Sequence, residues 1–243
     1  MPLHDWTRVK PGTYHNFHFL WLATIENRLN TGILPQGWFA MAEQRVGGPE
    51  ADVLTLSCPE AGRPAGPGIC LAPPQTAIIE RAERVRYARK THRIAIHHDL
   101  GTIVAVLELV SPGNKDTRAA LRSFARKSAA LLRNGIHLSV IDPFPPGKHD
   151  PRGIHQAIWN SITQESACVS PGDKPLIVVA YQAGEVPTAY VEPCAVGLPL
   201  PNLPLFLDEE LYVSVPLEET YQATWNVLPQ ILRDLLAPPA APT

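Results

Sequence analysis

The distribution of proline along the chain is the strongest constraint on its fold. The 243 residues include 26 prolines, yet the stretch from Gln75 to Asp142 contains only one, Pro112. Proline lacks a backbone N–H and has a fixed φ, so it is excluded from helix interiors and central strands. Residues 75–142 are therefore predicted to form the regular centre of the fold. The proline-rich flanks are predicted to form loops, edge strands and short elements.

Composition narrows the class of protein. The chain is 45% hydrophobic and 18% charged with a net charge of −2, which excludes a disordered chain and a globally basic one. It contains no apolar run of the roughly 20 residues that a transmembrane helix needs, and its start does not read as a signal peptide. Four cysteines without a CxxC pair argue against a zinc ribbon and a disulfide framework. We expect one cytoplasmic domain over residues 1–243, without membrane contact, and leave a homodimer open.

Hydrophobic periodicity predicts an α/β domain with a mixed sheet and flanking helices. The first part of the chain is expected to hold a helix over 13–30 and strands over 38–46, 52–57, 77–86 and 90–98. Residues 59–74 are rich in proline and glycine and are expected to be a mobile loop. The later part is expected to hold a helix over 151–163, a hairpin over 176–181 and 188–191, and a helix over 218–236 split at Pro229. Residues 237–243 are expected to be a disordered tail.

The most regular segment is a predicted βαβ unit at residues 102–142. Residues 102–110 are almost continuously apolar, which is typical of a strand covered on both faces. Residues 115–134 form an amphipathic pattern that ends before Gly135, and residues 136–142 form a second apolar run. A strand, a helix and a second strand joined by short connections predict a parallel crossover.

Four residues are candidates for chemistry. Glu108 is the only ionisable side chain in its apolar strand, so it must be paired or bind a metal. Asp52 opens another strand, where aspartate is also a common turn residue. Lys127 lies on the apolar stripe of the helix after the Glu108 strand, and Lys115 lies near the start of that helix. The structural alternatives are an ion pair for Glu108 and a solvent-directed lysine for Lys127.

Two carboxylates and a lysine can support phosphodiester hydrolysis. Asp52 and Glu108 offer the oxygen ligands that Mg²⁺ prefers. The ammonium group of Lys127 or of Lys115 could stabilise charge on the phosphoryl group. The sequence therefore predicts a candidate Mg²⁺ site.

Three segments resemble an uncharacterised bacterial family, domain of unknown function 4058. They run from Leu107 to Lys115, from Phe124 to Lys127 and from Asn134 to Asp142. The opening MPLHDW and the later YVEP and PLFL are similar to that family as well, so the resemblance covers most of the chain. The stretch from Glu108 to Asp142 is also similar to Uma-two-like proteins of the PD-(D/E)XK nuclease superfamily.

The second resemblance implies a restriction-endonuclease-like core. Asp52 matches the superfamily aspartate at a strand start, and Glu108 matches the acidic residue of the next core strand. The lysine normally found two residues later is Val110 here, and Ala51 stands where a proline is expected. Lys127 is then a lysine supplied from the following helix, with Lys115 as the second candidate. The alternative is a catalytically inactive binding or scaffold module on the same fold.

A basic segment near the centre of the chain is a candidate contact for nucleic acid. It includes Arg84, Arg86, Arg89 and Lys90. Such a strip can contact phosphates. A solvated hairpin face is the commoner explanation.

Overall fold

The computed structural model describes residues 3–42, 53–57, 68–82, 97–98, 101–163, 165–167 and 172–236. Of the sequence-based expectations, Asp52, most of the loop 59–74, the four basic residues of 84–90 and the tail 237–243 lie outside these ranges. Within them, none of the helices combines the length and the apolar character that a membrane span requires.

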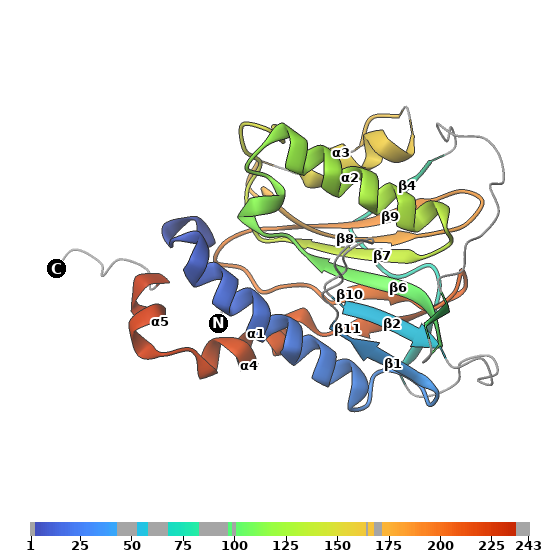
Figure 1. The fold of residues 1–243 in the computed structure, drawn as a ribbon, viewed down its shortest axis with the longest axis horizontal. Coiled ribbons are helices and arrows are strands. Elements are labelled where there is room, and N and C mark those ends of the chain that lie inside the picture. The colour runs from blue at the N-terminus through green and yellow to red at the C-terminus, as the bar shows by residue number, and fades with distance from the viewer. Residues whose placement is uncertain are drawn as a thin grey trace.

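The described residues form a mixed α/β fold with two sheets (Figure 1). The larger sheet has the order β1-β2-β6-β7-β8-β9-β4, with β5 also paired to β6. Pairing is antiparallel except between β6 and β7, which are parallel and joined through α2. The smaller sheet is antiparallel with the order β10-β11-β3. The predicted mixed sheet and βαβ unit are thus confirmed.

The strands have the following bounds: β1 Trp38–Met41, β2 Val53–Ser57, β3 Ile69–Leu71, β4 Ile78–Arg81, β5 His97–His98, β6 Gly101–Leu109, β7 His137–Asp142, β8 Leu176–Gln182, β9 Thr188–Cys194, β10 Leu203–Phe206 and β11 Leu211–Val215. The helices are α1 Pro11–Asn30, α2 Arg118–Arg133, α3 Gly153–Ile162, α4 Leu217–Val227 and α5 Gln230–Leu236, with short 3₁₀ turns η1 Trp6–Arg8 and η2 Pro112–Asn114. The final helix is split at Pro229, as predicted.

Both faces of the larger sheet are covered. On one face, α1, α4 and the smaller sheet pack against alternate residues of β6, Ala105, Leu107 and Leu109. On the other face, α2 and α3 pack in one layer with Val106 of the same strand and with Val110, which follows its end. Strand β6 is therefore buried on both sides, which explains its nearly continuous apolar sequence.

Local signals set the two ends of α2. The hydroxyl of Thr117 accepts a hydrogen bond from the backbone N–H of Ala120 at 3.0 Å and caps the first turn. At the other end Gly135 has φ +76°, and the N–H of Ile136 bonds to the carbonyl of Leu131. Glycine adopts this left-handed conformation without strain, so α2 ends there and the chain turns into β7.

Candidate functional site

Glu108 lies in β6 on the face that α2 covers. Its neighbours on the strand, Leu107 and Leu109, point into the opposite layer. The Glu108 side chain is only 6% exposed. A carboxylate at such a position is costly unless another charge or a ligand balances it.

Lys127 of α2 provides a balancing charge. Its Nζ lies 2.7 Å from Oε1 of Glu108, and its side chain is 21% exposed. Phe124 and Leu131, one turn away on either side, are buried, so the lysine runs along the apolar stripe as predicted. The ion-pair alternative for Glu108 is therefore realised with the same lysine that was predicted as a site residue.

Asp52 lies outside the described residues, but the strand that follows it is placed. Asp52 is bonded to Val53, the first residue of β2, and Val53 pairs with Leu107 of β6. Strand β2 thus begins next to the segment of β6 that carries Glu108. Among the described residues there is no group of three or more histidine, cysteine, aspartate or glutamate side chains that could hold a metal ion.

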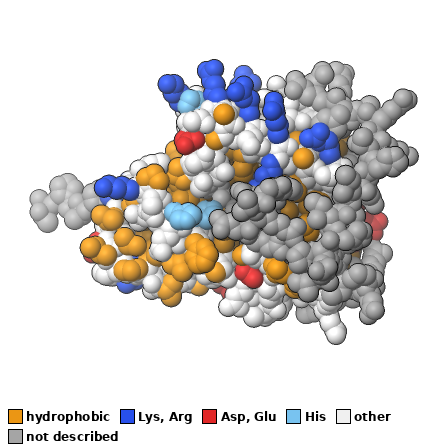
Figure 2. Space-filling view, in the orientation of Figure 1, with side chains coloured by type: hydrophobic (Ala, Val, Ile, Leu, Met, Phe, Trp, Pro, Cys, Tyr) orange, Lys and Arg blue, Asp and Glu red, His pale blue; other side chains and the backbone are white. Residues whose placement is uncertain are grey.

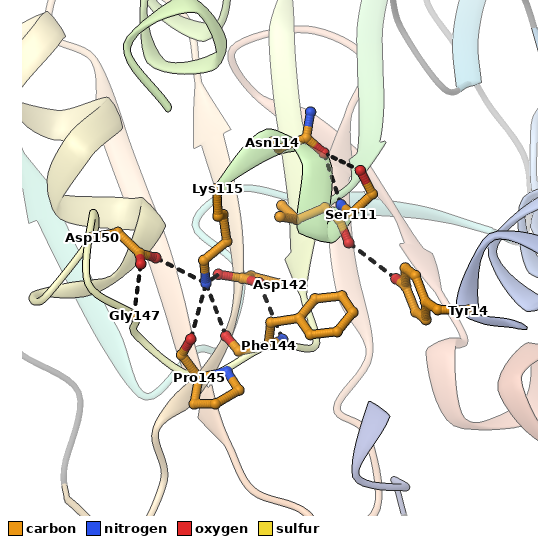
Figure 3. A network of polar contacts seen from close by, with 10 residues as sticks. Tyr14, Ser111, Asn114, Lys115, Asp142, Phe144, Pro145, Gly147 and Asp150 are labelled. Atoms are coloured by element: carbon orange, nitrogen blue, oxygen red, sulfur yellow. Dashed lines mark hydrogen bonds and ion pairs between the residues drawn. The ribbon is translucent and has the colours of Figure 1, made fainter. Parts of the chain in front are cut away.

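Lys115 belongs to a different cluster at the carboxyl ends of β6 and β7 (Figure 3). Its Nζ lies 2.9 Å from Oδ2 of Asp142 and 2.8 Å from Oδ2 of Asp150. It also donates to the carbonyl oxygens of Phe144 and Pro145 at 3.1 and 3.2 Å. The three charged side chains are at most 9% exposed. The Lys115 ammonium is therefore held by two aspartates and belongs to a cluster separate from the Glu108–Lys127 pair.

The lysine–aspartate cluster holds the loop after β7. Asp142 accepts the N–H of Phe144, and Asp150 accepts the N–H of Gly147 at 2.7 Å. Burial raises the pKa of Asp142 to about 6, against the opposing effect of Lys115. Burial alone lowers the pKa of Lys115, but the two aspartates outweigh it and the pKa is raised. The lysine therefore stays charged, and the loop is held by a buried ionic network.

A hydrogen-bonded chain of Glu80, His155 and Tyr181 was not predicted. Nε2 of His155 lies 2.6 Å from Oε2 of Glu80, and Nδ1 lies 2.7 Å from the hydroxyl oxygen of Tyr181. His155 and Tyr181 are 2% and 0% exposed. Glu80 lies in β4, His155 in α3 and Tyr181 in β8. These elements are far apart in the sequence, and no local motif brings the three residues together. Their contacts tie the edge strand β4 to α3.

Comparison of the chain with protein-family models, with curated proteins and with solved structures finds no match. The site must therefore be interpreted from its own geometry.

Lys127→Met tests the structural part of the ion pair. We expect the free energy of unfolding to fall by about 1–3 kcal/mol at pH 7, because Glu108 stays buried while it loses the ammonium of Lys127. The partial exposure of Lys127 keeps this below the cost of a fully buried pair. Urea denaturation measures the change. The double variant Glu108→Leu with Lys127→Met is expected to recover most of it, and a double variant as unstable as the single one contradicts the pairing.

Proposed function

We propose that the chain is a Mg²⁺-dependent phosphodiesterase that acts on nucleic acid. Asp52 and Glu108 are assigned as metal ligands, and Lys127 as the cation that stabilises charge on the phosphoryl group. The observation that carries this proposal is the Glu108–Lys127 pair, which sets an acidic and a basic group 2.7 Å apart where β6 meets α2.

The strand topology supports the assignment. The PD-(D/E)XK resemblance expects one acidic residue at a strand start and a second on the next core strand. Here β2 follows Asp52 and pairs antiparallel with β6, which carries Glu108. The crossover from β6 through α2 to the parallel strand β7 follows directly. Val110 occupies the usual lysine position, and a lysine on α2 reaches the same carboxylate instead.

The available donors suit a hard cation. A glutamate carboxylate is an oxygen ligand of the kind that Mg²⁺ prefers, and Glu108 lies on the face of β6 that packs against an apolar layer, where electrostatic interactions are stronger than in water. Bound Mg²⁺ supplies Lewis-acid polarisation of the phosphoryl group. Asp52 and Glu108 would hold the ion.

Lys127 has two functions in this proposal. Its ammonium orients the Glu108 carboxylate, and its side chain is 21% exposed, so part of it is accessible to a ligand. In hydrolysis, a water oxygen bonds to phosphorus, the ester P–O bond breaks and the leaving oxygen takes a proton. Negative charge builds up on the non-bridging oxygens during this step, and a nearby ammonium stabilises it.

A second candidate is a non-catalytic binding module on the same fold. The observation that favours it is that Lys127 already balances the charge of Glu108. The two functions differ in metal binding. A phosphodiesterase takes up Mg²⁺ or Mn²⁺ with measurable heat in calorimetry, and Glu108→Gln removes that heat, whereas a scaffold gives no heat in either form.

The cleavage assay uses labelled single- and double-stranded DNA and RNA with Mg²⁺ or Mn²⁺. We expect Glu108→Gln to lower kcat/KM by on the order of 10²-fold, because one metal ligand and its charge are lost. The matched control is Glu219→Gln, since Glu219 also pairs with a cation, Arg28, at 2.8 Å. The control is expected to retain activity. Cleavage that survives Glu108→Gln, or a wild-type protein that neither cleaves nor binds divalent ions, overturns the proposal.

A further inference from the structure

The outer face of α2 carries a row of arginines. Its sequence RAALRSFARKSAALLR contains four arginines and one lysine and no acidic residue. At about 100° per residue, Arg118, Arg122, Arg126 and Arg133 fall within an arc of about 80° on the helix. All four are exposed. The helix therefore presents a basic face, which we call the arginine face.

The arginine face is a local concentration of charge in a chain whose net charge is −2. Among the residues that the structure describes, no carboxylate pairs with Arg118, Arg122 or Arg126. Figure 2 shows lysine and arginine side chains gathered along the upper part of the molecule, over α2, with little acidic surface among them. The positive charge of these three arginines is available to a ligand.

We propose that the arginine face binds the phosphate backbone of nucleic acid. Successive arginines four residues apart rise by about 6 Å along the helix, so they can contact a line of phosphates rather than a single anion. The planar guanidinium binds phosphate oxygens in a bidentate manner. The choice of nucleic acid over other polyanions rests on the proposed function. The positive charge and the spacing of the arginines are observed independently of that function.

The packing of α2 argues against a lipid surface. A helix that lies on a membrane inserts an apolar face between the lipids. The apolar face of α2, including Leu121, Phe124 and Leu132, is buried against the sheet and α3. The outward positions between the arginines hold alanine and serine, which give little apolar area to insert.

The same helix links the arginine face to the proposed site. Arg126 is followed directly by Lys127, which points to the other flank of α2 and contacts Glu108. A backbone that follows the arginine face therefore runs along the helix that carries Lys127. The face fixes the substrate alongside the site without contributing to the chemical step.

The test compares two triple variants with the same change in charge. One is Arg118→Gln, Arg122→Gln and Arg126→Gln, and the control is Lys10→Gln, Arg28→Gln and Lys174→Gln, whose positions lie outside α2. Glutamine is a good helix former, so α2 is expected to remain folded, and circular dichroism checks this. Fluorescence anisotropy measures binding of a labelled 30-base-pair duplex at 50–200 mM NaCl. EDTA and the Glu108→Gln background keep the substrate intact.

We expect the arginine variant to raise Kd by at least about tenfold at the lower salt concentrations. It is also expected to reduce the slope of log K against log salt concentration by about 2–3, since three phosphate contacts are lost. The control variant is expected to change neither Kd nor the salt slope by much. Equal weakening in the two variants, no change in the arginine variant, or preferential binding of anionic vesicles or polyglutamate overturns the proposal. Binding is measured without metal, so it does not depend on cleavage. If the cleavage assay fails but the arginine variant still binds more weakly, the phosphodiesterase is refuted and the arginine face remains assigned as a nucleic-acid-binding surface.

Discussion

Lys115→Met is expected to lower the free energy of unfolding by about 3–5 kcal/mol at pH 7, because it leaves two buried carboxylates without their counter-charge. The side chains of Lys115, Asp142 and Asp150 are 9%, 3% and 1% exposed, so water cannot replace the ammonium. Three oxygen atoms also lose their hydrogen-bond donor, and Oδ2 of Asp150 loses its ion-pair partner. The methionine side chain is unbranched and close in length to that of lysine, so the change removes the charge and the hydrogen bonds more than the volume.

Urea denaturation at several pH values measures this effect. The matched control is Lys10→Met, at an exposed lysine, which is expected to change stability by less than about 0.5 kcal/mol. The loss in Lys115→Met is expected to be smaller at pH 5 than at pH 8, because burial raises the pKa of Asp142 to about 6 and its protonation removes one of the charges that the lysine no longer balances. A loss under about 1 kcal/mol, independent of pH, contradicts the structural role of the cluster.

His137 is expected to make the protein less stable in mild acid. Its Nδ1 accepts the backbone N–H of Ala183 at 3.0 Å, and the residue is 5% exposed. Burial lowers its pKa to about 4, although Asp208 acts in the opposite direction. The unfolded chain binds a proton near pH 6.5 and the folded chain only near pH 4, so the stabilising contribution is complete above pH 6.5. It is lost as the pH falls to 4, by about 3 kcal/mol at most.

His137→Asn isolates this contribution. The asparagine Oδ1 can accept the same N–H but does not titrate. We therefore expect the stability of the variant, measured by urea denaturation, to fall less than that of the wild type between pH 7 and pH 4.5. Asp142 has the opposite effect, since its folded pKa of about 6 lies above the usual value and its protonation favours the folded state at low pH. Asp142 is present in both proteins and cancels in the difference. Parallel stability curves contradict the prediction.

The helices and the βαβ unit could be predicted because their patterns are local. The helical spacing of Phe17, Trp21, Ile25 and Leu29 fixes the face of α1 that is buried in the core. Gly135 marks the end of α2 as predicted, whereas the helix begins at Arg118 after the Thr117 cap and not at residue 115. Pro112 lies in the 3₁₀ turn between β6 and α2, where a proline does not interrupt a ladder. In these segments, sequence spacing and tertiary packing favour the same structure.

The smaller sheet was not predicted, because its strands are short and contain or adjoin proline. Strand β10 includes Pro204, which is tolerated because β10 is an edge strand of a three-stranded sheet. Strand β3 lies inside the segment 59–74 that composition favours as a loop, and only its pairing with β11 makes it a strand. Strand β9 extends past the predicted end at Val191. Pro193 is accommodated where β9 pairs with β8 but no longer with β4.

The candidate site was predictable in part. The position of Lys127 on the apolar stripe followed from helical periodicity, and its contact with Glu108 followed from the crossover geometry. The partners of Lys115 could not be found in the same way, because Asp150 lies in an irregular loop whose course no periodicity encodes. The arginine face was not predicted, because its arginines are spread over 16 residues of α2 and are less dense in the sequence than the basic residues of 84–90.

Two strands of the segment between β2 and β6, β3 and β4, pair with strands that are distant in sequence. Strand β3 pairs with β11, and β4 pairs with β9, so both partners lie more than 100 residues downstream. Strands β1, β2, β6 and β7, by contrast, lie side by side in chain order. Closing long loops costs entropy before the new contacts repay it, so the consecutive strands can assemble first. During synthesis, β3 and β4 leave the ribosome early. They cannot pair until β11 and β9, which lie in the last third of the chain, have been synthesised.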